Sequence, residues 1–156
     1  MCAMTAIDQA VAQSRPRSKL VATWLAVIGG ALGAHRFYLR GKADPWAWLH
    51  VLATLVGAAG VVRMRQLGQD DQLAWVLAPV LGLVISAAML AALIMGLMSD
   101  EKWAGQFRPA QAVRPSGWGV ILAVISALLL GSTALMSTLA FSGQRFFEYL
   151  AQQPPA

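Results

Sequence analysis

Four stretches of the chain contain no Asp, Glu, Lys or Arg, and polar segments separate them. They cover residues 20–34, 46–62, 73–98 and 117–141, which are 15, 17, 26 and 25 residues long. A helix rises about 1.5 Å per residue and the hydrocarbon core of a bilayer is about 30 Å thick, so a span needs about 20 residues. The last two stretches meet that length, the second is near its lower limit and the first is short. The pattern predicts an all-α integral membrane helical bundle of about four transmembrane segments, the first short and either spanning or re-entrant.

The polar segments divide the chain further. In the segment after the third stretch, Ser99 is expected to cap a short helix over 100–106, with Trp103 and Phe107 on one of its faces. We expect a polar tail at 1–18, a helical hairpin at 19–62, a polar loop and the third transmembrane helix at 63–98, an interfacial loop with the short helix at 99–116, the fourth transmembrane helix and an interfacial end at 117–150, and a tail at 151–156.

Composition agrees with a membrane protein and narrows the expected partners. The 156 residues are 58% hydrophobic and 12% charged, whereas soluble domains carry about 25% charged residues. The net charge is +5, but the basic residues sit in small groups beside apolar runs rather than in a stripe interleaved with aromatics. We therefore expect the lipid bilayer as the main partner and no nucleic acid. The expected location is the plasma (inner) membrane, with several passes.

Small residues recur along the first stretch with helical spacing. In lipid, a face of small side chains lets two helix backbones approach closely, and van der Waals contact then holds them together. The first stretch is therefore expected to pack tightly against another helix of its own chain, of a membrane-protein partner or of a second copy. The predicted helix-packing residues are Ala22, Ala26, Gly30 and Ala34, four apart, and the second pair Gly29 and Gly33.

The sequence Gly-Ala-His-Arg-Phe-Tyr-Leu-Arg-Gly follows directly, at residues 33–41. His35, Arg36, Phe37 and Tyr38 form the candidate loop motif. Cations at a helix end complement its exposed carbonyl groups and reach lipid phosphates. One interpretation makes His35 and Arg36 a binding site for an acidic partner or a polar gate. The interpretation that we favour is structural: a turn that caps the helix and fixes the hairpin.

This motif and the Leu-Ala-Val-Ile-Gly-Gly-Ala-Leu-Gly run before it resemble the two-transmembrane-helix (TM-two) domain family. The resemblance covers about residues 18–62. It implies a spanning helical hairpin with the His-Arg-Phe-Tyr loop in the cytoplasm, and a role at membranes rather than a known reaction.

The distribution of Lys and Arg allows two topologies. If all four stretches span, each side of the membrane holds six basic residues, which gives no orientation. If the first stretch instead re-enters on its own side, the count becomes nine against three. We expect the spanning hairpin, as the resemblance implies.

The remaining chemistry argues against catalysis. The four stretches contain no ionisable side chain except His50, and His35 and His50 without carboxylate or thiolate neighbours make a poor metal site. We find no nucleophile elbow, zincin motif or phosphate-binding loop. The expected function is therefore a non-enzymatic helix-packing or interaction module without a cofactor. The alternative is a small channel or transporter subunit with a polar path near His35, Arg36 and His50.

Overall fold

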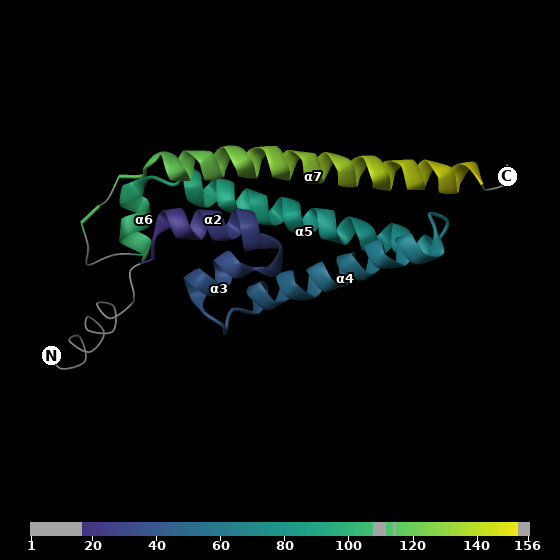
Figure 1. Cartoon of the computed structure of the whole chain (residues 1–156), viewed down its shortest axis with the longest axis horizontal. Helices are drawn as coiled ribbons and strands as arrows, with labels where there is room; N and C mark the ends of the chain where they lie inside the picture. The colour runs from purple at the N-terminus through teal and green to yellow at the C-terminus, as the bar shows by residue number, and fades with distance from the viewer. Residues whose placement is uncertain (1–16, 108–111, 114, 153–156) are drawn as a thin grey trace.

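The computed structural model describes residues 17–107, 112, 113 and 115–152, and these residues form helices joined by short turns (Figure 1). The expected tails lie largely outside the described residues. The elements are α2 (Lys19–Gly29), the 3-10 helix η1 (Gly30–Leu32), α3 (Ala34–Arg40), α4 (Pro45–Leu67), α5 (Gln72–Leu97), α6 (Asp100–Phe107) and α7 (Trp118–Ala151).

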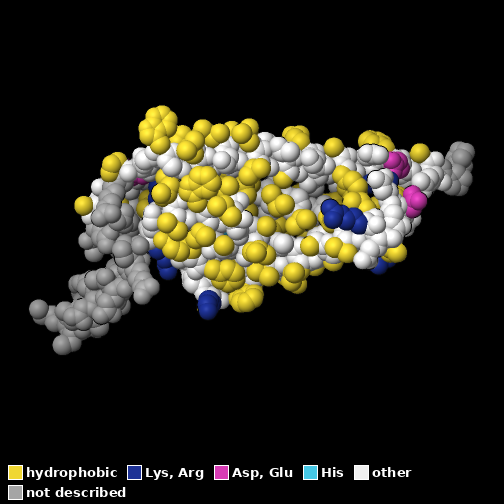
Figure 2. All heavy atoms as spheres, viewed as in Figure 1, with side chains coloured by type: hydrophobic (Ala, Val, Ile, Leu, Met, Phe, Trp, Pro, Cys, Tyr) yellow, Lys and Arg dark blue, Asp and Glu magenta, His cyan; other side chains and the backbone are white. Residues whose placement is uncertain are grey.

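Three of these helices, α4, α5 and α7, are long and apolar enough to cross a membrane. α5 lies between α4 and α7 and packs along both, while α2 fills the space beside α5 and α7 over part of their length (Figure 1). Large apolar side chains cover much of the outer surface of the bundle (Figure 2). Only lipid can accommodate such a surface without cost, so the expected all-α membrane bundle is confirmed.

The helix boundaries follow the sequence pattern closely. The stretch at 46–62 lies within α4, and the stretch at 73–98 forms nearly all of α5. The stretch at 117–141 forms the first part of α7, which continues to Ala151. The short helix expected over 100–106 is α6, and the side-chain oxygen of Ser99 accepts a hydrogen bond from the backbone N–H of Lys102 at 3.3 Å. Asp44 caps α4 in the same way, because its side chain accepts from the N–H of Trp46 at 3.2 Å.

The first apolar stretch does not continue as one helix. Gly33 has φ +71°, a left-handed conformation that L side chains rarely adopt, and it separates η1 from α3. A Cβ at Gly33 would also lie 2.8 Å from the carbonyl oxygen of Ala47 in α4. At this residue the chain reverses direction, and α3 returns beside α2 toward the end of the bundle from which α2 came (Figure 1).

The return of α3 favours one of the two arrangements of the first stretch. The backbone N–H of Ser18, just before α2, donates a hydrogen bond to the Tyr38 hydroxyl near the end of α3, at 3.0 Å. We call the segment formed by α2, η1 and α3 the re-entrant hairpin. Both of its ends therefore lie at the same end of the bundle. This geometry matches the re-entrant arrangement, not the spanning hairpin that we expected, because the left-handed turn at Gly33 stops α2 before it reaches spanning length.

Candidate functional site

The two ends of the bundle differ in charge. We call the end with the 41–44 loop, the start of α2 and α6 the basic end, and the end with residues 68–71 the loop end. Among the described residues, the basic end holds Arg17, Lys19, Arg36, Arg40, Lys42 and Lys102 against Asp44, Asp100 and Glu101, while the loop end holds Arg63, Arg65 and Arg145 against Asp70, Asp71 and Glu148. The excess positive charge of the described residues thus lies at the basic end alone.

A polar network ties α2 to α6 at the basic end. The ammonium group of Lys19 donates hydrogen bonds to the carbonyl oxygen of Met98 (2.5 Å), to the Asp100 carboxylate (2.9 Å) and to the Ser116 hydroxyl (3.0 Å). Hydrogen bonds from Ser116, together with those from Lys19, lower the pKa of Asp100 to about 2. The indole N–H of Trp103 donates to the Arg17 carbonyl at 3.1 Å. These contacts fix where α2 enters the bundle.

The His-Arg-Phe-Tyr motif lies in helix α3 and not in a loop as we expected, because the N–H groups of Arg36 and Phe37 donate to the Gly33 carbonyl and begin a helix. Three of its side chains make contacts within the chain. The Arg36 guanidinium donates to the Asp44 carboxylate at 2.9 Å, the ring of Phe37 meets that of Trp48 edge-on at 5.4 Å between centroids, and the Tyr38 hydroxyl accepts from Ser18. Burial alone would raise the pKa of Asp44, but the hydrogen bond and charge of Arg36 hold it below the usual value. The motif therefore joins α3 to the start of α2 and of α4.

His35 is the fourth motif residue and is almost fully buried, with 3% of its surface exposed. Its ring lies 5.8 Å from the His50 ring, centroid to centroid and edge-on. The Nδ1–H of His50 donates to the Trp46 carbonyl oxygen at 2.9 Å, whereas the Nδ1 of His35 has no hydrogen-bond partner among the described residues. No group of three His, Cys, Asp or Glu side chains suited to a metal ion occurs in the described part of the chain.

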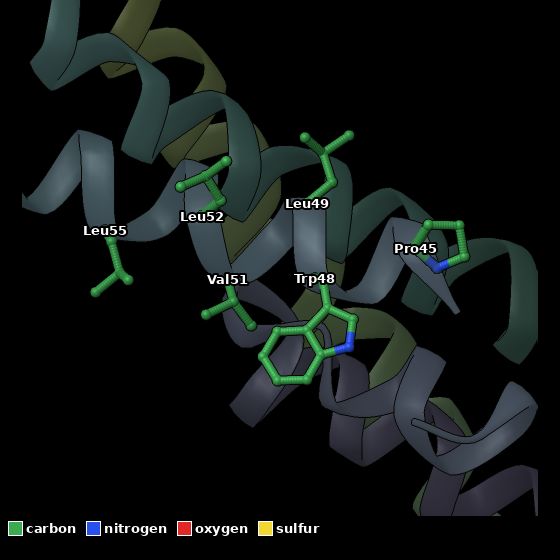
Figure 3. Close-up of a pocket in the computed structure, with 6 residues that line it drawn as sticks. All are labelled: Pro45, Trp48, Leu49, Val51, Leu52 and Leu55. Atoms are coloured by element: carbon green, nitrogen blue, oxygen red, sulfur yellow. The ribbon is translucent and has the colours of Figure 1, made fainter. Parts of the chain in front are cut away.

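Three cations at the basic end remain available for an external partner. Arg40, Lys42 and Lys102 are exposed, and none of them has a carboxylate of the described residues within ion-pair distance. The indole N–H of Trp48 donates to the Lys42 carbonyl at 3.0 Å. From Trp48 an apolar depression runs along α4; it is lined by Pro45, Trp48, Leu49, Val51, Leu52 and Leu55 (Figure 3). A tryptophan between a cationic loop and an apolar surface is typical of a membrane interface.

The small residues of the first stretch pack inside the chain. Ala22, Ala26 and Gly30 are buried, and a Cβ at Gly30 would lie 2.6 Å from the Cβ of Ala88 in α5. A Cβ at Gly29 would lie 2.9 Å from the Cβ of Ala34. This face therefore packs against α5 of the same chain, which is one of the three possibilities.

Two contacts were not found from the sequence. The Thr54 hydroxyl of α4 donates to the carbonyl oxygen of Ala31 at 2.6 Å and so holds the tip of the hairpin. At the loop end, the Arg145 guanidinium donates to Glu148 at 2.6 Å and to Gln69 at 2.8 Å, and it stacks on the Trp75 ring. Nothing in the sequence around Thr54 indicates its contact with Ala31. The position of Arg145, alone after a long apolar stretch, could have indicated that its side chain needs polar partners.

Together these features define a multi-pass helical membrane protein with a short hairpin held against three long helices. Residues 15–66 match the TM2 domain family. The resemblance seen over residues 18–62 is confirmed, and the match covers about a third of the chain. No curated protein and no solved structure was found to match the chain.

Proposed function

We propose that this chain is a non-enzymatic membrane interaction module that presents a rigid basic surface to an acidic membrane-protein partner. The surface consists of Arg40, Lys42 and Lys102, which are exposed at the basic end. The observation that carries the proposal is the one-sided charge: among the described residues, the loop end has three cations and three carboxylates, whereas the basic end has six cations and three carboxylates. An uncompensated charge on a fixed framework favours recognition of the opposite charge.

The rigidity of the framework supports this role. Arg36, Phe37 and Tyr38 hold α3 against its neighbours, and Lys19 holds the start of α2 against α6. Arg40 ends α3 and Lys42 follows two residues later, so both cations sit on a loop whose two sides are fixed. A preorganised surface loses less entropy on binding than a mobile tail.

We infer that the basic end faces the cytoplasm and that the protein resides in the plasma (inner) membrane. With a re-entrant hairpin, nine of the 12 Lys and Arg residues belong to segments on the side of the basic end. An excess of Lys and Arg in the short segments flanking spans favours the cytoplasmic side. Anionic lipids of that leaflet would then surround the same surface.

A photo-crosslinking experiment tests the interaction. The photoreactive residue p-benzoylphenylalanine replaces Ala43, which is exposed between the two sides of the basic loop, in the full chain in its own membranes. The matched control carries it in place of Gln66, which is exposed near the loop end. We expect a discrete crosslinked species from position 43 and not from 66, and we expect the combined Arg40→Gln and Lys42→Gln changes to abolish it. Equal crosslinking at both positions would contradict the proposal.

One observation favours a second function, a channel or transporter subunit. The buried Nδ1 of His35 has no hydrogen-bond partner among the described residues, and the His35 ring meets the His50 ring edge-on. Two neighbouring imidazoles are suited to a polar path. Conductance in a reconstituted bilayer that falls after His35→Ala, in a variant that still folds, would support this function. An unchanged or absent conductance leaves the interaction module as the better explanation.

A further inference from the structure

The hairpin packs against one face of α5, which we call the seat of the hairpin, and this face continues beyond the tip of the hairpin. Ala88 and Ala92 of α5 lie in the core with the hairpin, and the same helical stripe continues through Ile85 and Gly82 to Ala78. α2 and η1 together measure about 22 Å, roughly half the length of α5. Figure 1 shows α2 ending midway along α5 while α4 and α7 continue toward the loop end.

An apolar groove of about 280 Å³ occupies the half of the seat that the hairpin leaves open. α4, α5 and α7 all contribute to its walls, in contrast to the depression of Figure 3, which lies on α4 alone. The hydroxyl of Thr138 in the wall donates to its own helix at 2.7 Å, so it offers no free donor to a ligand. The lining residues are Val61, Met64, Ala78, Pro79, Leu81, Gly82, Ile85, Ala134, Ser137, Thr138 and Phe141.

Cationic and aromatic groups stand at the loop end of this groove. The guanidinium of Arg145 lies 5.6 Å from the ring centroid of Phe141, which lines the groove, and 5.3 Å from that of Trp75. Its Nε–H has no acceptor among the described residues. Arg65 follows Met64 of the groove wall directly, is exposed, and has no carboxylate of the described residues within ion-pair distance. The groove is thus apolar along its length and has arginines at its end, near one membrane surface.

We propose that the groove holds one acyl chain of a phospholipid from the leaflet at the loop end, with the lipid phosphate beside Arg65. The hairpin fills the seat from one membrane surface to about the middle of the bundle, and a lipid chain from the opposite leaflet spans the remaining half. Phosphate accepts hydrogen bonds from guanidinium groups, and Arg65 is exposed and has no carboxylate of the described residues within ion-pair distance.

The size of the groove argues against a helix of a second copy. An α-helix is about 10–12 Å across, so two turns of it occupy roughly 1000 Å³. Even the whole space of the groove, about 630 Å³ including its open side, is smaller than that volume. An extended hydrocarbon chain is much thinner and bends to follow the walls. A bound chain would also make dispersion contacts with the walls, which an empty groove between three helices lacks.

Native mass spectrometry of the full chain in a mild detergent tests the proposal, with phosphatidylglycerol or phosphatidylcholine added after delipidation. Ser137→Phe fills the groove, and Thr133→Phe is the matched control, because Thr133 is an exposed hydroxyl residue of α7 that does not line it. We expect Ser137→Phe to weaken retention of one phospholipid by about tenfold or more. Thr133→Phe should retain it as the unmodified chain does, and Arg65→Gln should weaken it.

Equal lipid retention by Ser137→Phe and Thr133→Phe would overturn the proposal. A Ser137→Phe chain that changes from dimer to monomer with its lipid count unaltered would also overturn it, in favour of a second copy. Retention that is unchanged by Arg65→Gln would overturn the phosphate contact, whichever of the two lipids is used. If Ser137→Phe fails to fold, Val61→Phe fills the groove from its α4 wall and is judged by the same outcomes.

Discussion

Gly30 lies where the tip of the hairpin meets α5, and a single added methyl group there tests the packing of the hairpin. A Cβ at Gly30 would lie 2.6 Å from the Cβ of Ala88, whereas carbon atoms in contact are about 3.5–4.0 Å apart. The hairpin must therefore move from α5 by about 1 Å. That shift also loosens Ala22 and Ala26, which are fully buried. We expect Gly30→Ala to lower the free energy of unfolding by about 1–3 kcal/mol, the usual cost of overpacking.

Gly143→Ala provides the matched control for this prediction. Gly143 lies within α7, and nothing lies within 4 Å of an added Cβ. Alanine in a helix is more stable than glycine by about 0.5–1 kcal/mol, so the control should unfold at the same or a slightly higher temperature. Thermal unfolding of the three proteins in one detergent measures the difference. A Gly30→Ala protein as stable as the Gly143→Ala protein would refute the close contact between the hairpin and α5.

Three further measurements address the topology, the motif and the polar network. With Cys2 replaced by serine, single cysteines at Ser18 and Lys42 should react with an impermeant thiol reagent from the same side of the membrane, because both ends of the hairpin lie at the basic end; reaction from opposite sides would restore the spanning hairpin. Arg36→Ala should lower the free energy of unfolding by about 1–3 kcal/mol, since it leaves the buried Asp44 carboxylate without its partner, and thermal unfolding that is unaffected would remove the structural role of the motif. The pKa of Asp100 is lowered from 3.8 to about 2, so its carboxylate adds stability that is fully present above pH 3.8 and is lost as the pH falls to about 2. Between these pH values, the unfolding temperature of Asp100→Asn should therefore fall less than that of the unmodified chain. An equal fall in both proteins would count against the network.

The sequence was sufficient for the helices and insufficient for their arrangement. Uncharged runs longer than the bilayer core predicted α5 and α7, and Ser99 marked the start of α6. The count of basic residues allowed a re-entrant first stretch, but the reversal could not be placed at Gly33, because glycine is also common inside membrane helices and only the surrounding packing shows its left-handed conformation. The hydrogen bond between Ser18 and Tyr38 joins residues 20 positions apart, and no local pattern records such a pairing.

The candidate site shows the same division. The spacing of Ala22, Ala26 and Gly30 correctly predicted close packing, yet it could not distinguish a partner helix from α5. Arg36 was recognised as a candidate, but its ion pair with Asp44 depends on how α3 meets the start of α4. Local spacing therefore identifies which side chains take part, whereas their partners come from contacts between distant segments.

The seat of the hairpin also determines the order in which the chain can fold during synthesis. The indole N–H of Trp24 in α2 donates to the carbonyl oxygen of Gly119 in α7, 95 residues later, at 3.1 Å. A ribosome adds about 5–20 residues per second, so roughly 5–20 s pass between the synthesis of these two residues. The first apolar stretch therefore cannot complete its contacts until α7 has been made. Until α5 arrives, the small-residue face of α2 is exposed and open to capture by a chaperone or by another chain.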